Sequence, residues 1–207
     1  MHDLLRAEVE WSPELPMTAA WKHTPTHADA AKLEAETGLR HELVDGELFA
    51  MAGGTPEHNQ LSGNVFGELY IQLKGKPCRV VGSDQKVHVL DENDDAGLYP
   101  DVAVYCGPRQ RSAAVSTALT NPSALFEVVS DSTEADDRGR KFELYRSLES
   151  LQHYVMLSQK RPSVEVYDRN EDGTWTLRLA GSGDRLALSA IGAELVVDDL
   201  YIDVFDE

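Results

Sequence analysis

The feature that most constrains this chain is a run of apolar residues at 124–130 with one carboxylate in its middle. The run reads Ala-Leu-Phe-Glu-Val-Val-Ser, and Glu127 is its central residue. A continuous apolar run of this length predicts a strand that is buried on both faces. Because an unpaired carboxylate there would be costly or would become protonated, we expect a cation or hydrogen-bond donors beside Glu127.

A second carboxylate is expected at the end of a sheet. Asp101 directly follows Pro100 near the opening of an apolar stretch at residues 98–106, which predicts a strand. Proline is confined to the start or the edge of a strand, because it cannot donate a hydrogen bond to the ladder. Asp101 should therefore lie near one end of the sheet.

A lysine on a helix is the expected partner of these carboxylates. The spacing predicts a helix over about residues 136–150, with Lys141 on its apolar face rather than with Arg140 on the solvent face. The residues on this face are Asp137, Lys141, Leu144, Tyr145 and Leu148. A second interpretation stays open: a helical pair between Asp137 and Lys141, worth about 0.3–0.5 kcal/mol, next to an ordinary buried salt bridge of Glu127.

The other elements follow from local signals. Thr26 is the expected N-cap of a short helix that stops at Gly38, and Thr55 with Pro56 should start a longer helix that ends at Gly75. An Asp-Gly pair predicts a hairpin turn within residues 41–51. Together with the strands at 98–106 and 124–130, we expect strands at 79–82, 85–90, 151–158, 163–169 and 175–180. This order predicts an α/β or α+β fold with a mixed β-sheet flanked by helices.

Length and composition favour a single globular domain. For a chain of 207 residues we expect an irregular N-terminal segment at 1–25 and a single domain at 26–207. Two cysteines cannot build a disulfide framework, so Cys78 and Cys106 are expected to be buried free thiols. No apolar stretch is long enough to cross a bilayer and no signal peptide is recognisable, which predicts a cytoplasmic protein.

The net charge of −17 opposes binding to a polyanion. A local basic strip on an acidic body would still attract one, because charges act mainly within a Debye length of about 8–10 Å. The basic residues that group in the sequence are Lys74, Lys76 and Arg79, then Arg109 and Arg111, then Arg138, Arg140, Lys141 and Arg146. The alternative is that these are scattered, solvated charges.

Other catalytic motifs are not recognisable. His41-Glu42 opens like a zinc-protease motif, but Asp45 stands where the second histidine is required. The other histidines are dispersed along the chain, and no serine lies in a nucleophile elbow. Zinc-dependent hydrolysis is therefore not expected.

Several motifs, taken in order, resemble one known family. Pro100-Asp101 is followed by Glu127 with Val-Val-Ser after it, and then by Asp137, Lys141 and Tyr145. This order resembles the Uma-two family of restriction endonucleases, within the PD-(D/E)xK nuclease superfamily. Glu-Leu-Val-Asp-Gly-Glu at 42–47, Pro-Glu-His-Asn at 56–59 and Gly-Ser-Asp at 82–84 resemble it too, so the likeness runs from about residue 26 to 170.

The resemblance implies a metal-dependent DNA endonuclease with a restriction-endonuclease-like fold and extra C-terminal strands. Asp101, Glu127 and the backbone carbonyl of Val128 would hold Mg²⁺ or Mn²⁺, which prefer oxygen ligands. Lys141 would complete the catalytic set, and Glu42 and His58 are secondary candidates. A homodimer is plausible because two sites can cut two strands.

One departure from the superfamily pattern bears on catalysis. The lysine normally follows the acid by two residues, where both side chains share a strand face, but Val129 stands there. The resemblance implies that the lysine has moved to the helix, at Lys141. If it has not, a noncatalytic nucleic-acid-binding or interaction module that keeps the nuclease fold is the alternative.

Overall fold

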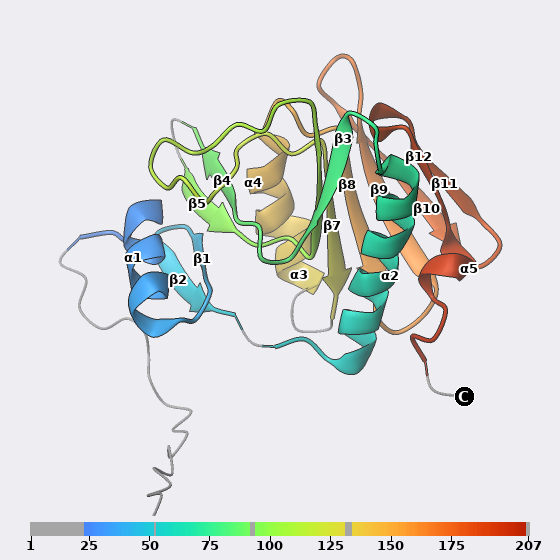
Figure 1. Cartoon of the computed structure of the whole chain (residues 1–207), viewed down its shortest axis with the longest axis horizontal. Helices are drawn as coiled ribbons and strands as arrows, with labels where there is room; N and C mark the ends of the chain where they lie inside the picture. Colours follow the sequence, from blue (N-terminus) through green and yellow to red (C-terminus); the bar gives the residue numbers. More distant parts are fainter. Residues whose placement is uncertain (1–22, 52, 92–93, 131–133, 206–207) are drawn as a thin grey trace, which may run out of the picture.

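The computed structural model describes residues 23–51, 53–91, 94–130 and 134–205 (Figure 1). Most of the expected N-terminal segment, residues 1–22, lies outside this range. In the part that is described, no helix combines the length and the apolar character needed to cross a membrane.

A six-stranded mixed sheet forms the centre of the fold, in the order β10-β9-β8-β7-β6-β3. Its strands are β3 (Cys78–Gly82), β6 (Val102–Cys106), β7 (Ala124–Val129), β8 (His153–Ser158), β9 (Ser163–Arg169) and β10 (Trp175–Gly181). β7 and β8 are parallel and every other neighbouring pair is antiparallel. The expected mixed sheet flanked by helices is confirmed.

Two smaller sheets accompany it. A four-stranded sheet in the order β2-β1-β5-β4 consists of β1 (His41–Val44), β2 (Glu47–Ala50), β4 (Val87–Leu90) and β5 (Asp95–Leu98). A hairpin of β11 (Arg185–Leu188) and β12 (Ala193–Val196) lies near the C-terminus. The prediction of one strand over 98–106 is wrong, because Pro100 interrupts the ladder and the chain passes there from β5 in one sheet to β6 in the other.

Helices cover both faces of the large sheet (Figure 1). α2 (Pro56–Leu73) and α4 (Phe142–Arg146) lie on opposite faces of this sheet, whereas α1 (His27–Thr37) packs on the four-stranded sheet. The other helical elements are α3 (Glu134–Asp136), the π-helical turn η1 (Asp137–Lys141), the 3₁₀ turn η2 (Ser189–Ile191) and α5 (Val197–Leu200). The predicted N-caps Thr26 and Thr55 are confirmed, since both accept backbone N–H bonds. The helix expected at 136–150 instead starts at Glu134, ends at Arg146 and contains the π turn.

Strand β7 separates two hydrophobic clusters. Phe126 and its same-face neighbours pack toward α2, whereas Leu125 and Val129 pack toward α4. All six residues of β7 are buried, as the apolar run predicted. Because side chains alternate along a strand, Glu127 points to the α4 side.

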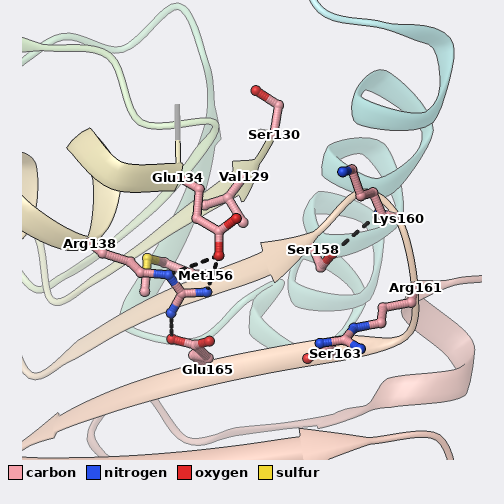
Figure 2. A pocket seen from close by; sticks show the side chains of 10 residues that line it. All are labelled: Val129, Ser130, Glu134, Arg138, Met156, Ser158, Lys160, Arg161, Ser163 and Glu165. Carbon is pink, nitrogen blue, oxygen red and sulfur yellow. Dashed lines mark hydrogen bonds and ion pairs between the residues drawn. The ribbon is translucent and has the colours of Figure 1, made fainter. Parts of the chain in front are cut away.

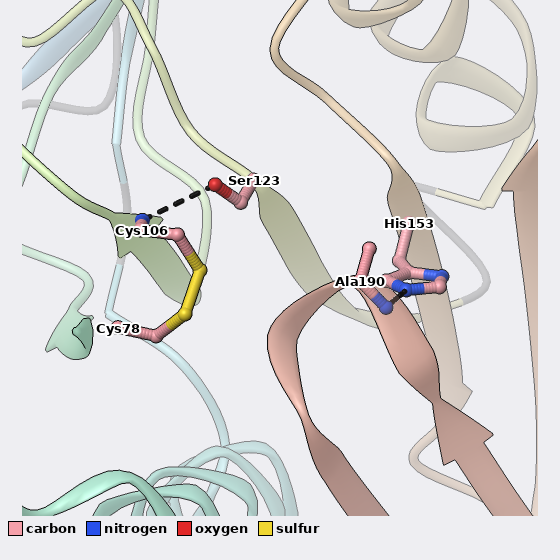
Figure 3. Close-up of a disulfide and its surroundings, with 5 residues drawn as sticks. All are labelled: Cys78, Cys106, Ser123, His153 and Ala190. Carbon is pink, nitrogen blue, oxygen red and sulfur yellow. Dashed lines mark hydrogen bonds between the residues drawn. A yellow bond between two sulfur atoms is a disulfide. The ribbon is translucent and has the colours of Figure 1, made fainter. Parts of the chain in front are cut away.

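Cys78 and Cys106 form a disulfide, so the expectation of two free thiols is wrong (Figure 3). The two residues lie directly opposite each other in the antiparallel pair of β3 and β6. Ser123 Oγ accepts a hydrogen bond of 3.2 Å from the Cys106 N–H. The disulfide therefore ties the edge strand β3 to the sheet, at the opposite end of β6 from Asp101.

Candidate functional site

The predicted site residues meet at one end of the β6–β7 pair. Asp101 immediately precedes β6, Glu127 lies within β7, and Lys141 closes the π turn above the same sheet face. Glu42 reaches the site from β1 in the four-stranded sheet, and His58 from the first turn of α2.

Asp101 is fixed by two contacts. Its Oδ2 accepts a hydrogen bond of 2.8 Å from the backbone N–H of Val128 and lies 3.1 Å from His58 Nε2. The hydrogen bond to Asp101 raises the pKa of His58, although burial of the ring acts in the opposite direction. Asp101 therefore joins the start of β6 to β7 and to α2, with 15% of its side chain exposed.

Glu127 is only 4% exposed. Its Oε1 accepts a hydrogen bond of 3.3 Å from the hydroxyl of Tyr145. Burial raises the pKa of Glu127 well above its ordinary value, and the positive charge of Lys141 acts against this rise. The nearby carboxylates that raise the pKa further are Asp137, Asp101 and Glu42. Lys141 is thus outnumbered by the carboxyl groups around it.

Lys141 lies among carboxylates, as its place on the apolar face predicted. Its Nζ is 3.1 Å from Glu42 Oε2 and 3.3 Å from Asp137 Oδ1, and its side chain is 16% exposed. Burial disfavours the charged form, but the surrounding carboxylates, led by Glu127, raise the pKa of the ammonium above its ordinary value. The helical pair with Asp137 is present, but it is one contact of a larger cluster rather than an isolated surface pair.

Glu42 is buried rather than exposed at the hairpin edge, with 8% of its surface accessible. Its Oε1 accepts a hydrogen bond of 2.9 Å from the backbone N–H of Tyr99, and its Oε2 contacts Lys141. These bonds connect the four-stranded sheet to the π turn. Glu42 was a secondary candidate from the sequence, but its contacts with Tyr99 and Lys141 could not be predicted, because they depend on the long-range pairing of β1 with β5.

The donor set at this end of the sheet suits a hard divalent cation. Carboxylate oxygens dominate, and they carry more negative charge than Lys141 neutralises. Among the described residues, however, no set of three His, Cys, Asp or Glu that includes Asp101 and Glu127 has ligand atoms all within 4.8 Å of one another. A cation held by these two would take its other ligands from water and backbone carbonyls, such as that of Val128.

A polar pocket of about 300 Å³ opens beyond the carboxyl end of β7 (Figure 2). It is lined by Val129, Ser130, Glu134, Arg138, Met156, Ser158, Lys160, Arg161, Ser163 and Glu165. Arg138 pairs with Glu134 at 2.7 Å and also with Glu165, so this part of the expected basic strip is matched by acids. Lys160 and Arg161, in the turn between β8 and β9, were not selected from the sequence because a charged turn is usual on a surface.

Arg140 is also matched by acids, since it pairs with Asp45, Asp94 and Glu143. A second, unrelated cluster was not predicted from the sequence. His27, His88 and Asp95 come together, although the sequence analysis treated the histidines as dispersed. The hairpin of β4 and β5 brings His88 beside Asp95, and the packing of α1 against the four-stranded sheet adds His27.

Comparison with known proteins agrees with this fold. The model of the Uma2 family, "Putative restriction endonuclease", matches residues 28–199. The chain is 36% identical over 162 residues to the "Uncharacterized protein slr1290" of Synechocystis, covering 78% of this chain and 83% of that relative. It is 29% identical over 161 residues to the "Uncharacterized protein sll1609" of the same organism, covering 78% and 90%.

A solved structure shows the same fold. The crystal structure of "a putative nuclease belonging to DUF820" from Anabaena variabilis superposes with a TM-score of 0.69. The match covers 87% of this chain and all of the other, at 14% identity. The extent of the family match, together with the relative at 36% identity, shows that this chain belongs to the Uma2 family.

Proposed function

We propose that this protein is a metal-dependent DNA endonuclease that hydrolyses phosphodiester bonds. The observation that carries the proposal is the excess of buried carboxylate around Glu127, with Lys141 inside it. A buried excess of negative charge is destabilising unless a cation or a function offsets it. Membership of a family described as "Putative restriction endonuclease" supports the same reaction class.

Asp101, Glu127 and the carbonyl of Val128 would hold Mg²⁺ or Mn²⁺. When bound, such an ion supplies a water of lowered pKa and offsets negative charge on the phosphate. The carboxylates are held ready for this role, Asp101 by the Val128 N–H and Glu127 by the Tyr145 hydroxyl.

Lys141 is the catalytic cation of the chain itself. Its ammonium keeps its proton at neutral pH, because the surrounding carboxylates raise its pKa. It therefore acts as a hydrogen-bond donor that orients the attacking water and stabilises the charge that develops on the phosphate oxygens. Glu42 and Asp137 position the amine, and His58 positions Asp101.

The pocket beyond β7 is the expected place for the DNA backbone next to the scissile phosphate. Lys160 and Arg161 supply positive charge on its rim. Because the whole chain carries a charge of −17, binding should depend on these local residues and weaken steeply with salt. A homodimer would present two such sites to the two strands.

The decisive test is nicking of supercoiled plasmid DNA with Mg²⁺ or Mn²⁺. Lys141→Ala and Asp101→Asn should each lower the rate by about 10²–10³-fold, the usual cost of losing a preorganised charge stabiliser. Lys32→Ala is the matched control, because Lys32 is exposed on α1 and, among the described residues, forms an ion pair with Glu36 alone, at 4.0 Å. Circular dichroism should show each variant folded.

Full activity in folded Lys141→Ala would overturn the catalytic role of this lysine. If the wild-type protein binds DNA without cutting it under any divalent ion, the noncatalytic binding module is the correct function. That alternative is favoured by Val129, which occupies the usual position of the lysine on β7.

A further inference from the structure

We propose that His27, His88 and Asp95 form a second metal site, which binds a divalent transition-metal ion such as Zn²⁺. The three residues come from α1, β4 and β5, and they lie apart from the carboxylates around Glu127. One ligand atom from each lies within 4.8 Å of the other two. The proposal is independent of nuclease activity.

The hairpin of β4 and β5 supplies two of the ligands. His88 Nε2 lies 2.9 Å from Asp95 Oδ1. Neighbouring ligands of an ion with bonds of about 2.1 Å are separated by about 3 Å in octahedral and slightly more in tetrahedral geometry. The pair is therefore already spaced as two adjacent ligands of one ion.

His27 supplies the observation that points to a ligand. The residue is fully buried, and neither ring nitrogen has a hydrogen-bond partner. A buried polar group without a partner costs roughly 1–3 kcal/mol, and native proteins almost always satisfy such groups with protein, water or an ion.

The local backbone is shaped to place this ring. Gly97 lies directly opposite His88 in the β4–β5 pair, and a Cβ added to Gly97 would come within 2.3 Å of His27 Nδ1. The His27 ring therefore occupies the space that a side chain at 97 would fill. Asp95 Oδ2 also accepts the backbone N–H of His27 at 3.1 Å, which fixes the start of α1 beside the carboxylate.

Ser112 provides the outer contact that metal-binding histidines normally have. Its Oγ lies 2.7 Å from His88 Nδ1, on the side of the ring away from Asp95. Such a contact fixes the ring orientation and leaves the other nitrogen to the ion. Two imidazoles and one carboxylate favour zinc, nickel, cobalt or iron over Mg²⁺, with water completing the coordination.

Two features act against a cation here, and both are local. Lys86 is nearby and lowers the pKa of His27, but its Nζ pairs with Glu34 at 2.8 Å, which offsets its charge. The His27 and His88 rings stack at 4.1 Å with 4° between their planes. Binding one ion through both rings therefore requires the His27 ring to rotate about its side-chain torsions.

The ion would serve to fasten α1 to the small sheet. α1 packs on β1 and β5. A metal ion bound by His27, the first residue of α1, and by residues of β4 and β5 would link the helix to both strands. Metal binding to the folded state alone raises the free energy of unfolding by RT ln(1 + [ion]/Kd). We therefore assign the site a structural role.

The test is titration of the metal-stripped, untagged full chain with Zn²⁺ by calorimetry in millimolar Mg²⁺, which occupies oxygen-only sites. One equivalent should bind, and His27→Ala and His88→Ala should each weaken affinity at least 10-fold. His41→Ala is the matched control, because His41 is equally buried with both ring nitrogens unpartnered but has no converging ligands among the described residues. It should bind Zn²⁺ as the wild type does.

A second measurement covers variants that fail to fold. X-ray absorption of the wild-type zinc complex should show the scattering of two imidazoles in the ligand shell. Absence of stoichiometric Zn²⁺ binding by the wild type, or a shell without imidazole, would overturn the proposal. So would wild-type affinity in folded His27→Ala.

Discussion

Replacing Glu127 by glutamine should make the metal-free protein more stable while it abolishes cleavage. Glutamine has nearly the same shape and can still accept the Tyr145 hydrogen bond, which is 3.3 Å long. It removes a carboxylate that is 4% exposed and lies beyond ion-pair distance of Lys141, whose Nζ contacts Glu42 and Asp137 instead. The cost of burying this charge should therefore disappear at little expense in contacts.

The magnitude follows from proton linkage. Burial raises the pKa of Glu127 well above the ordinary 4.5, so above pH 4.5 the unfolded chain releases a proton that the folded chain retains. The folded state then binds more protons than the unfolded state, and the free energy of unfolding falls as pH rises. The loss is at most about 1.4 kcal/mol per pH unit, or about 2.7 kcal/mol over two units, until the raised pKa is passed.

The assay is urea unfolding in EDTA at pH 5, 6 and 7. The stability of Glu127→Gln relative to the wild type should increase with pH across this series. Glu36→Gln, at an exposed carboxylate on α1, should show no such trend. Parallel pH profiles of the wild type and Glu127→Gln would refute the argument that this carboxylate is held in a destabilising site.

The other predictions concern the core, the disulfide and a buried histidine. Leu69→Ala should cost about 2–5 kcal/mol, because Leu69 is fully buried in the α2 cluster, whereas Ile71→Ala, at a site 73% exposed, should change stability by less than about 0.5 kcal/mol. Reduction of the disulfide between Cys78 and Cys106, which are 28 residues apart, should lower the free energy of unfolding by about 3.6 kcal/mol according to the chain-entropy relation. DNA cleavage should be unchanged. Burial lowers the pKa of His153, so stability should fall as pH drops below 6.5, and His153→Gln should flatten this slope.

Each of these has a direct check. Urea denaturation, with equal m-values, measures the stability of the Leu69 and Ile71 variants. An equal loss of stability at both positions would contradict the assignment of the buried face of α2. Reduction by dithiothreitol should lower the urea midpoint, and an unchanged midpoint would mean that the bond does not restrain the unfolded chain. For the histidine, an identical acid slope in wild type and variant would show that its protonation is not linked to unfolding.

Local signals in the sequence were sufficient for most helices and turns. Thr26 with Gly38, and Thr55 with Pro56, mark the ends of helices through backbone hydrogen bonding that depends only on neighbouring residues. The Asp-Gly turn was likewise predictable, because Asp45 and Gly46 both adopt positive φ there.

Long-range pairing set the features that the sequence did not reveal. The disulfide requires Cys78 to lie opposite Cys106 in register, and a spacing of 28 residues does not indicate this. The strands at Arg185–Leu188 and Ala193–Val196 were not assigned, although Leu186 and Leu188 alternate with exposed residues, because four residues carry a weak period-2 signal.

The site was predictable in part. Lys141 could be placed near the sheet from helical phase, because one face of the segment is apolar. The burial of Glu42 could not be predicted, since it depends on how the two sheets meet at Tyr99. The contact of His27 with His88 likewise depends on the packing of α1 against the small sheet. A contact between residues so distant in the sequence cannot be predicted from one sequence.

The π turn at Asp137–Lys141 has an evolutionary consequence. A π turn differs from an α turn by one extra residue, and it commonly arises by a single insertion into a helix. Such an insertion rotates the residues before it by roughly a quarter of a turn relative to the residues after it. If Lys141 takes the place of a lysine on β7, as we propose, one inserted codon in this helix would suffice to turn a cation toward the same carboxylates, with the buried strand left untouched.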